Sequence, residues 1–149
     1  MTSAAQAFLI PDRLEPDLEG VHAYWNGLKR GENTIPFWDD VEFSTLTQRC
    51  RTITMVTAFE DPLRFRFDLM SDDLTRRYDA AIVGTFTDEL HLHAPLDELT
   101  DQCRATVKRG APTWCRHGSD DGGYSRLILP LWGNGHIEML IVAISLSPR

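Results

Sequence analysis

Two alternate histidines are the residues whose spacing comes nearest to a metal site. His91 and His93 could share one face of an extended chain, and imidazole nitrogens are common zinc ligands. Acidic residues lie close by in the sequence at Asp88, Glu89 and Asp97. No third ligand follows at a spacing typical of a metal site, so the favoured interpretation is a pair of loop histidines among acids. A small metal-dependent enzyme that uses His91 and His93 is the remote alternative.

Nucleophiles and paired carboxylates are the next candidates for chemistry. The sequence has no Gly-x-Ser-x-Gly turn, and Cys103 falls on the apolar stripe of a predicted helix, where a thiol usually packs inertly. The carboxylate pairs fall in predicted turns or helix starts, where Asp side chains commonly cap the backbone. These pairs are Asp39-Asp40, Asp72-Asp73 and Asp120-Asp121. We therefore expect a protein that is not an enzyme and has no metal site.

The composition indicates one soluble domain. The chain has 149 residues and a formal net charge of −7, and this acidic balance disfavours nucleic acid as a partner. Its three cysteines, Cys50, Cys103 and Cys115, form no CxxC pair, which is typical of a reducing compartment. No apolar run approaches the roughly 20 residues of a membrane span, and the N-terminus lacks the basic residues of a signal peptide. A cytoplasmic protein without membrane contact is the expectation.

The elements that would position these residues begin after an N-terminal arm. Residues 1–16 are predicted to be a flexible arm, and residues 17–149 a single domain. A helix is expected from Asp17 to Arg30, because apolar residues recur at three- and four-residue spacing before Gly31. Those residues are Leu18, Val21, Trp25 and Leu28, with Tyr24 beside them. The pattern fits a helix docked on its own domain and a helix paired with a second copy equally well.

Two hairpins are the strongest strand signals. Tyr124 to Trp132 and Ile137 to Leu146 flank Gly133-Asn134-Gly135, and Asn-Gly readily takes the positive φ of a tight hairpin turn. The last run is apolar on both alternating faces, which predicts a central strand covered on both sides. Cys50 to Phe59 and Leu63 to Leu69 form the other hairpin, and the apolar alternation of its second strand predicts one buried face and one exposed face.

Helical pieces and one more strand are expected between the hairpins. Pro95 to Arg109 carries an apolar stripe, and Gly110 ends it after two basic residues. Pro112 to His117 is a predicted short strand. The order of helix, two strands, helical pieces and three strands predicts an α+β fold with an antiparallel sheet.

Several short motifs resemble those of the single-domain PAS-like proteins of alphaproteobacteria. The order of the elements is also that of the PAS fold, and the similarity covers about residues 15 to 147. The motifs of this sequence are Tyr24-Trp25, Leu28-Lys29-Arg30-Gly31 with Pro36, Phe65-Arg66-Phe67, Gly84-Thr85, Gly110-x-Pro112 and Tyr124-x-Arg126-Leu127-x-Leu129-Pro130-Leu131. The final motif is the most specific of them.

The resemblance implies a fold, a role and partners. The fold is a five-stranded antiparallel sheet with helices packed on one face, an N-terminal amphipathic helix and a small enclosed cavity. The role is that of a cytoplasmic sensor or protein-interaction adaptor without its own output domain. A histidine kinase or another regulatory protein is the implied partner. PAS domains commonly dimerise through the helix that precedes the sheet, so a homodimer is expected.

The expected dimer or partner interface combines this helix with the turn that follows it. It comprises Leu18, Val21, Tyr24, Trp25, Leu28, Phe37 and Trp38. The turn has aromatic residues where the family has a basic side chain, so no polar ligand contact is carried over to it. An adaptor without a ligand would keep a closed core and expose an apolar patch around Trp25, Phe37 and Trp38.

An internal pocket for an unknown small molecule is the alternative to a filled core. The residues expected to line or fill it are Phe65, Phe67, Tyr78, Leu99, Cys103, Trp114, Arg126, Leu127 and Leu129. Arg126 is the most informative, because on an inward face it would need an acidic partner or an anionic ligand. On the outer face it would be a solvated strand residue.

No cofactor is expected. A photochemical flavin domain of the PAS type would carry a cysteine in residues 80–90, and a haem-binding one a histidine on the helix from Pro95 to Arg109. The sequence has neither residue at these places. Flavin photochemistry and haem binding are therefore disfavoured.

Overall fold

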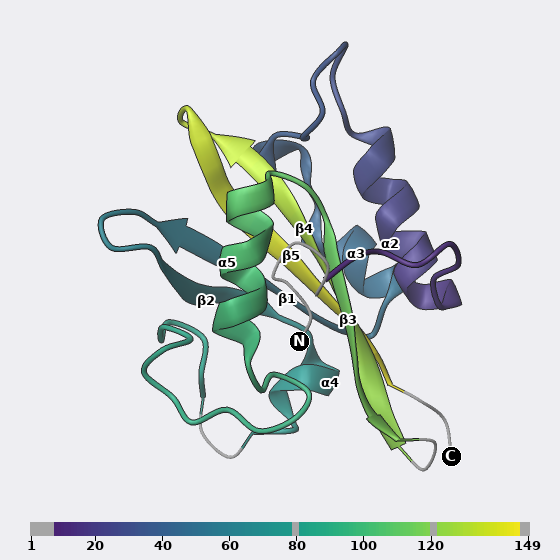
Figure 1. Cartoon of the computed structure of the whole chain (residues 1–149), viewed down its shortest axis with the longest axis vertical. Coiled ribbons are helices and arrows are strands. Elements are labelled where there is room, and N and C mark those ends of the chain that lie inside the picture. The colour runs from purple at the N-terminus through teal and green to yellow at the C-terminus, as the bar shows by residue number, and fades with distance from the viewer. Residues whose placement is uncertain (1–7, 79–80, 120–121, 147–149) are drawn as a thin grey trace.

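One antiparallel sheet of five strands organises the chain (Figure 1). Its strands are β1 (Thr52–Phe59), β2 (Arg64–Met70), β3 (Thr113–Ser119), β4 (Gly122–Gly133) and β5 (His136–Leu146). In the computed structural model, which describes residues 8–78, 81–119 and 122–146, they lie in the order β2-β1-β5-β4-β3. β5 is central, with antiparallel neighbours on both sides. This confirms the central position and the antiparallel sheet that were predicted.

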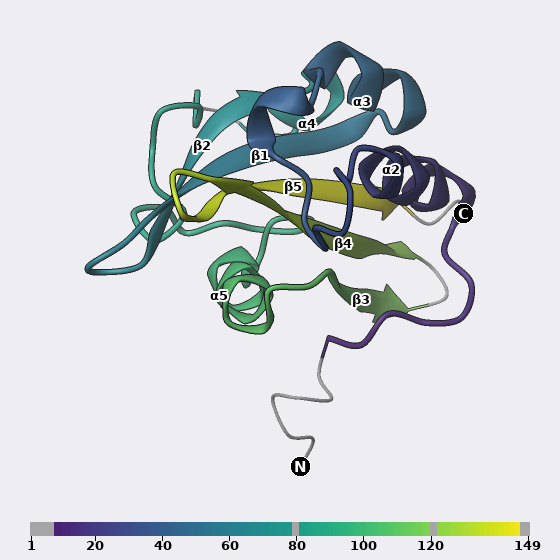
Figure 2. The ribbon, with the colours of Figure 1, turned by 90° about the horizontal axis from the view of Figure 1, so that it is seen from above.

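Helices cover both faces of this sheet (Figure 2). On one face lie α2 (Pro16–Gly27) and α3 (Phe43–Arg49), which both precede β1 in the chain. The short 3-10 helix η1 (Trp38–Asp40) lies between α2 and α3 in the sequence. The other face carries α4 (Asp72–Thr75) and α5 (Leu99–Arg109), which come between β2 and β3. The expectation of helices on one face thus needs correction, because α2 and α3 build a second layer. No helix in the described part of the chain is both long and apolar enough to cross a bilayer.

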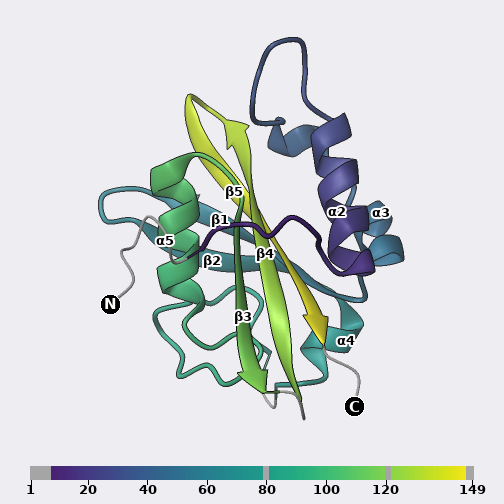
Figure 3. The ribbon, with the colours of Figure 1, turned by 45° about the vertical axis from the view of Figure 1, so that its right-hand side comes forward.

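The helices α2 and α5 lie on opposite sides of the sheet (Figure 3), and each face has its own apolar core. The α2-side core consists of Leu18, Val21, Trp25, Leu46, Cys50, Ile53, Met55, Leu127, Leu129, Leu131, Met139, Ile141 and Ala143. The α5-side core consists of Val56, Ala58, Phe65, Phe67, Leu74, Ile82, Leu96, Leu99, Cys103, Tyr124, Ile128, Ile137, Leu140, Val142 and Ile144. Because side chains alternate along a strand, β5 supplies Ile141 to one core and Leu140 to the other. This is why its sequence is apolar at almost every position.

A bulge between β1 and β2 changes which side chains of β2 face the core. Phe67 lies in the α5-side core, but Leu69 is 44% exposed, although the alternation placed both on one face. Phe67 lies opposite Val56, and Leu69 lies opposite Met55. β2 therefore has one extra residue, Asp68, and its side chains change face after it. The expectation that Leu69 is buried is wrong for this reason.

α5 begins later than its sequence predicted. The helix was expected from Pro95, whereas it begins at Leu99. Glu98 adopts the left-handed backbone region with a φ of 58°, which a right-handed helix cannot contain, and the preceding residues form a turn. The carbonyl groups of Pro95 and Asp97 consequently lie outside the helix and are free to accept hydrogen bonds from side chains.

An irregular segment covers the β2 edge of the sheet. The amide of Gly84 donates to the Phe67 carbonyl at 2.7 Å, and the amide of Thr87 donates to the Phe65 carbonyl at 2.8 Å. The exposed backbone of an edge strand can pair with another chain. Here residues 84–87 occupy part of that edge.

The described part of the N-terminal arm is attached to the opposite edge. The Trp114 amide of β3 donates to the Phe8 carbonyl at 3.0 Å, and the side chains of Ile10 and Leu14 pack against the α2-side core. This part of the predicted arm is therefore in contact with the domain through a backbone hydrogen bond and apolar packing. Residues 1–7 lie outside the described residues, as does the Asp120-Asp121 pair.

Candidate functional site

Arg126, on β4, carries a charge inside the α5 side of the sheet. Its side chain is fully buried, and strand alternation directs it to the opposite face from Leu127, which belongs to the α2-side core. Of the two positions that the sequence left open, the structure has the inward one. Removing a guanidinium from water is costly unless partners compensate for the lost hydration. The groups around Arg126 therefore decide what this residue can do.

Neutral groups hold the guanidinium of Arg126. Nε donates to Oε1 of Gln102 at 2.7 Å, and Nη1 donates to the carbonyls of Pro95 and Asp97, both at 2.9 Å. Nη2 is buried and has no hydrogen-bond partner among the residues that the structure describes. Within the described ranges no carboxylate oxygen lies within the 4.0 Å of an ion pair with Arg126. Its positive charge is therefore not neutralised by a direct contact.

Gln102 on α5 connects Arg126 to its polar neighbours. Oε1 also accepts from the Cys115 thiol at 3.2 Å, while Nε2 donates to the Thr113 hydroxyl at 3.2 Å and to the Arg126 carbonyl at 3.0 Å. The hydroxyls of Thr106 and Thr113 lie 2.7 Å apart. We refer to Arg126, Gln102, Thr106, Thr113 and Cys115 as the Arg126 cluster. All five residues are buried between α5 and the strands β3 and β4.

Three side chains hold the turn that leads into α5. The Tyr78 hydroxyl donates to the His93 carbonyl at 2.9 Å, the Tyr124 hydroxyl donates to the Asp97 carboxylate, and Arg126 binds two carbonyls. Burial raises the pKa of Tyr78 to about 12. Burial, followed by the hydrogen bond with Asp97, raises the pKa of Tyr124 as well. Both phenols are therefore protonated donors at neutral pH.

A hollow of about 320 Å³ adjoins this turn. Its lining consists of Thr87, Leu90, His91, Leu92, Asp97, Glu98, Leu99, Thr100 and Asp101. The hydroxyls of Thr87 and Thr100 lie 2.7 Å apart. Asp97 belongs to both places, because its carbonyl accepts from Arg126 and the residue lines the hollow.

The structure separates the residues that were expected to line a single pocket. Phe65, Phe67, Leu99 and Cys103 lie in the α5-side core, and Tyr78 packs against it. Trp114, Leu127 and Leu129 instead belong to the α2 side. Adjacent residues of one strand cannot share a face, so Arg126 and Leu127 are on opposite sides of the sheet. One pocket cannot hold all nine residues, and only the α5-side members can surround Arg126.

The structure also buries part of the expected dimer interface. Leu18, Val21 and Trp25 face the chain's own sheet and are at most 2% exposed. Nε1 of Trp25 donates to the Pro130 carbonyl of β4 at 2.8 Å. The helix is thus docked on its own domain, which was one of the two alternatives. These three side chains are covered, so the expectation that Trp25 belongs to an exposed apolar patch is wrong.

The other residues of that interface lie nearer the surface. Tyr24, Leu28 and Phe37 are half-buried, and Trp38 is 42% exposed. The Arg30 guanidinium lies over the Phe37 ring, 4.4 Å from its centroid. Trp38 is therefore the member of the set that offers the most apolar surface to a partner.

Trp38 borders a hollow of about 360 Å³ on the α2-side face of the sheet. Its lining, which we call the sheet patch, consists of Trp38, Thr57, Phe59, Arg66, Asp68, Glu138 and Met139. Trp38 is packed closely over Gly133, since a Cβ atom there would lie 2.4 Å from its Cδ1. Arg66 lies 4.9 Å from the centroid of Phe59 and forms an ion pair with Asp68 at 2.8 Å. The patch thus combines two exposed aromatic rings with charges that are already paired.

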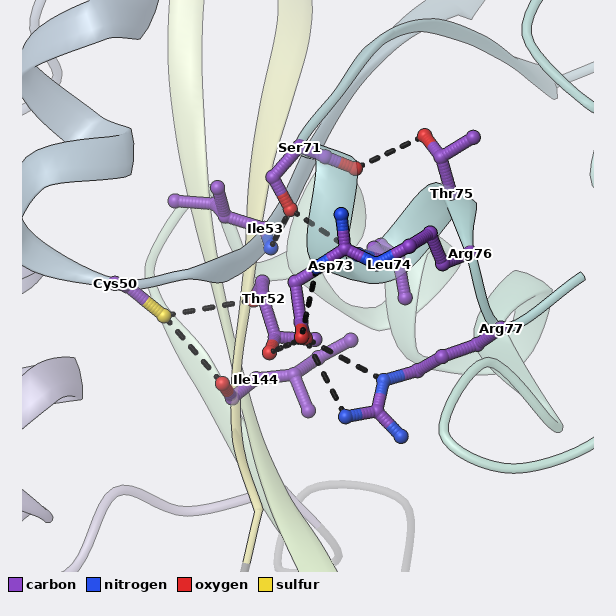
Figure 4. Close-up of polar contacts among 10 residues, drawn as sticks. All are labelled: Cys50, Thr52, Ile53, Ser71, Asp73, Leu74, Thr75, Arg76, Arg77 and Ile144. Carbon is purple, nitrogen blue, oxygen red and sulfur yellow. Dashed lines mark hydrogen bonds and ion pairs between the residues drawn. The ribbon is translucent and has the colours of Figure 1, made fainter.

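A second polar cluster attaches α4 to β1 (Figure 4). Oγ of Ser71 accepts from the amide of Leu74 at 3.4 Å, as an N-cap does, and from the amide of Ile53 at 3.1 Å. The Asp73 carboxylate accepts from the Thr52 hydroxyl at 2.6 Å. Every one of these groups has a partner, so fold stability explains the cluster.

All three cysteines are free and buried. Burial raises the pKa of Cys50 to about 11 and that of Cys103 to about 12, and it also raises the pKa of Cys115. Sγ of Cys50 donates to the carbonyls of Thr52 and Ile144 at 3.4 Å (Figure 4). A thiolate nucleophile would need the opposite shift of the pKa.

The histidines considered as metal ligands lie apart from a ligand set. His91 and His93 are exposed, and the His93 ring is stacked on Tyr78 with 4.5 Å between centroids. Among residues 8–78, 81–119 and 122–146, no three His, Cys, Asp or Glu residues come together as metal ligands.

Sequence reasoning missed the residues that surround Arg126. Gln102 and Thr106 lie three and seven positions after Leu99, on the buried side of α5. A polar residue at core spacing is the signal that could have revealed them. No signal was available for the Pro95 and Asp97 carbonyls, because they depend on the turn before α5.

Comparisons of the chain with family models, with curated proteins and with solved structures find no match. The geometry described above is therefore what supports a function.

Proposed function

We propose that the chain is a PAS-like signalling domain that acts in the cytoplasm as an adaptor. It binds a regulatory protein rather than converting a substrate. The five-stranded antiparallel sheet, with two strands before α4 and α5 and three after them, supports this proposal, because it agrees with the element order on which the resemblance to single-domain PAS-like proteins rests. An adaptor needs a stable scaffold and a contact surface, and both cores are filled by apolar side chains.

The sheet patch is the observation that carries this proposal. Trp38 and Phe59 are 42% and 36% exposed on one face of a sheet whose other large apolar residues are mostly buried. Tryptophan and arginine are enriched among the residues that dominate binding energy in protein interfaces. The packing of Trp38 on Gly133 and the stacking of Arg66 on Phe59 hold these side chains in place, so little conformational entropy is lost when a partner binds.

The partners proposed for this surface are a second copy of the chain and a histidine kinase or related regulator. The apolar residues of α2, Leu18, Val21 and Trp25, are covered by the chain's own sheet, so a homodimer would form through the sheet patch instead. An adaptor passes a signal on through contact with such a protein.

A two-hybrid screen against the histidine kinases and response regulators of the source organism tests the adaptor function. We expect at least one of them to bind the wild type, and a Trp38→Ala variant to lose most of that binding. Leu69→Ala is the matched control, because Leu69 is equally exposed on β2 but lies outside the sheet patch. The adaptor proposal fails if no regulator binds, or if Trp38→Ala and Leu69→Ala bind like the wild type.

A small-molecule sensor is the second candidate, favoured by the buried Nη2 of Arg126, which has no partner. A sensor would change its contact with the regulator when a ligand occupies the α5 side of the sheet. The two functions are compatible, since the sheet patch and Arg126 lie on opposite faces.

A further inference from the structure

The α2-side face of β1 becomes more exposed along the strand. Ile53 and Met55 are buried in the α2-side core, whereas Thr57 and Phe59, which follow on the same face, line the sheet patch. Phe59 is one of the exposed large apolar residues of the chain. The turns of the β1–β2 and β4–β5 hairpins lie on the side of the molecule away from α2 and α3 (Figure 1). The sheet patch is therefore the part of this face that lies near the hairpin turns.

Two β-bulges place carboxylates in the sheet patch. The bulge of β2 adds Asp68, and the pairing of β5 with β4 skips Glu138 in the same way. Bulges commonly redirect a side chain, and both of these carboxylates line the patch. Arg66 lines it as well, and all three charged side chains are partly exposed. The patch thus presents both signs of charge to a partner.

Arg66 and Glu138 can each accept a further ionic partner. Arg66 binds Asp68 through Nε and Nη2, and its Nη1 has no hydrogen bond within the described residues. Oε1 of Glu138 accepts from Nδ2 of Asn134 at 3.2 Å and lies 3.4 Å from Nε2 of His136. Oε2 of Glu138 has no such contact in the described ranges. A carboxylate and a guanidinium from another molecule can therefore pair with these two residues.

We propose that the sheet patch binds a second copy of the chain across a two-fold axis, with Arg66 of each copy paired with Glu138 of the other. The inference rests on the contact role proposed above for the patch, and it specifies the occupant. A two-fold interface brings the same surface together from both copies, so that surface must complement itself. Thr57 lies opposite Arg66 of β2 and opposite Met139 of β5, next to Glu138. A two-fold axis that passes over Thr57 exchanges the two charged positions.

Trp38 and Glu138 together form a place for an incoming guanidinium. A Cβ atom on Gly133 would lie 2.4 Å from Cδ1 of Trp38 and 3.0 Å from Cβ of Glu138, so the two side chains are neighbours. An arginine from outside can stack on the indole and pair with the carboxylate. Arg66 is the arginine that the two-fold axis brings there.

The overall charge makes these specific pairs necessary. Each copy has a formal net charge of −7, so two copies repel each other at long range. Opposite charges that meet at the interface fix the orientation of the copies and offset part of this repulsion. The patch has seven residues, fewer than the roughly 20 to 30 on each side of a stable interface, so we expect a Kd of about micromolar or weaker.

Sedimentation velocity of the full chain tests this interface by charge exchange. From about 1 µM to about 1 mM, the average mass of the wild type should rise from monomer toward dimer. Arg66→Glu and Glu138→Arg each place like charges opposite one another twice, and each should raise the Kd at least about 10-fold. An equimolar mixture of the two variants should dimerise like the wild type, because every facing pair in the mixed dimer again has opposite charges. Native mass spectrometry identifies the mixed dimer by its mass.

Two charge reversals outside the patch are matched controls. Arg104→Glu on α5 and Glu19→Arg on α2 change the net charge by the same amounts at exposed positions, and both should dimerise like the wild type. Circular dichroism checks that each variant is folded. Trp38→Ala should also raise the Kd, and it decides the question together with the remaining charge variant if one of the two does not fold.

Four results would overturn the inference. They are a wild type that stays monomeric, a folded patch variant that dimerises like the wild type, a mixture that stays monomeric, and controls that lose the dimer as the patch variants do. A dimeric wild type that binds no regulator refutes the adaptor function alone. A monomeric wild type that binds a regulator through Trp38 refutes this inference alone.

Discussion

The two faces of the sheet are stabilised in different ways, although the same strands build both. On the α2 side, β4 contributes Leu127 and Leu129, and a tryptophan of α2 packs on them with its indole nitrogen bound to a carbonyl. On the α5 side, the same strand contributes Ile128 and Arg126, and Arg126 is held by a glutamine and two carbonyls. Burial of apolar surface accounts for the first face, whereas the second contains a charge that packing alone does not require.

On the α5 side, a gain in stability alone does not account for the buried residues. A buried arginine is often no better for stability than an apolar residue of similar size. Yet the α5 side contains the buried Arg126 cluster with one guanidinium nitrogen that has no partner, whereas the other buried polar atoms without a partner in the described residues, Trp114 Nε1 and Glu15 Oε1, belong to half-buried side chains. The α2-side core therefore serves as the scaffold under the sheet patch, and the α5 side carries the polar group on which the sensor candidate rests.

Among variants of the two faces, truncation of Trp25 on the α2 side should cause the largest loss of stability. Trp25→Ala removes a fully packed indole and its hydrogen bond to the Pro130 carbonyl, so we expect a loss of about 4 kcal/mol in the free energy of unfolding. Urea denaturation measures it. Trp25→Phe keeps most of the packing and should lose only about 1.5 kcal/mol.

Light scattering on the same variants separates packing from dimerisation. A folded Trp25→Ala protein should keep the mass of the wild type, because Trp25 faces its own sheet. A variant with unchanged stability and half the mass would instead show that α2 pairs with a second copy, and the scaffold role of the α2 side would be wrong.

Arg126→Met, on the α5 side, should cause the next largest loss of stability. It leaves the Gln102 oxygen and the carbonyls of Pro95 and Asp97 without their donor, and we expect a loss of about 3 kcal/mol in the absence of ligand. Urea denaturation at neutral pH measures this loss. If the variant is as stable as the wild type, the three hydrogen bonds contribute nothing net.

A double-mutant cycle with Gln102→Leu sharpens this result. The two residues share a hydrogen bond of 2.7 Å, so their effects on the free energy of unfolding should be non-additive by about 1 kcal/mol or more. Trp25→Phe combined with Arg126→Met is the control, because these residues lie on opposite faces and should be additive. Additivity in the first pair would show that Gln102 does not hold Arg126.

The sequence predicted the sheet better than it predicted the site. Period-two patterns and the Asn-Gly turn identify the strands, because they are local properties of the chain. The bulge at Asp68 and the left-handed backbone of Glu98 depend on contacts between distant residues, and they displaced Leu69 and the start of α5. Arg126 was marked as informative, but its partners could not be named, since two of them are backbone carbonyls of a turn.

Ser71→Ala should have a smaller effect on the α5 side. Oγ of Ser71 accepts from two amides, one in α4 and one in β1, and their loss should cost about 1.5 kcal/mol. Ser71→Thr should retain most of that stability, because its hydroxyl can accept the same bonds. A loss below about 0.5 kcal/mol for Ser71→Ala would mean that water replaces the hydroxyl as the acceptor of these two amides.

Substitution of Asp73 should have the smallest effect on stability of the variants considered. Asp73 is a charged residue of the α5 side that, unlike Arg126, has a partner of opposite charge. The Thr52 hydroxyl bond and the charge of Arg77 hold the pKa of Asp73 below its usual value. The unfolded chain therefore takes up this proton at a higher pH than the folded chain. The stabilisation is complete above the unfolded pKa of about 3.9 and is lost as the pH falls through the folded pKa.

Asp73→Asn should remove this dependence. At neutral pH we expect the variant to lose less than about 1 kcal/mol, because the carboxylate is partly exposed and screened by solvent. The difference from the wild type should shrink toward zero in acid, as measured by urea denaturation between about pH 2 and 7. Thr52→Val should reduce the same difference, since it removes the hydrogen bond that lowers the pKa most. A difference that is constant across this range would show that Asp73 acts through its shape and not its charge, in contrast to Arg126.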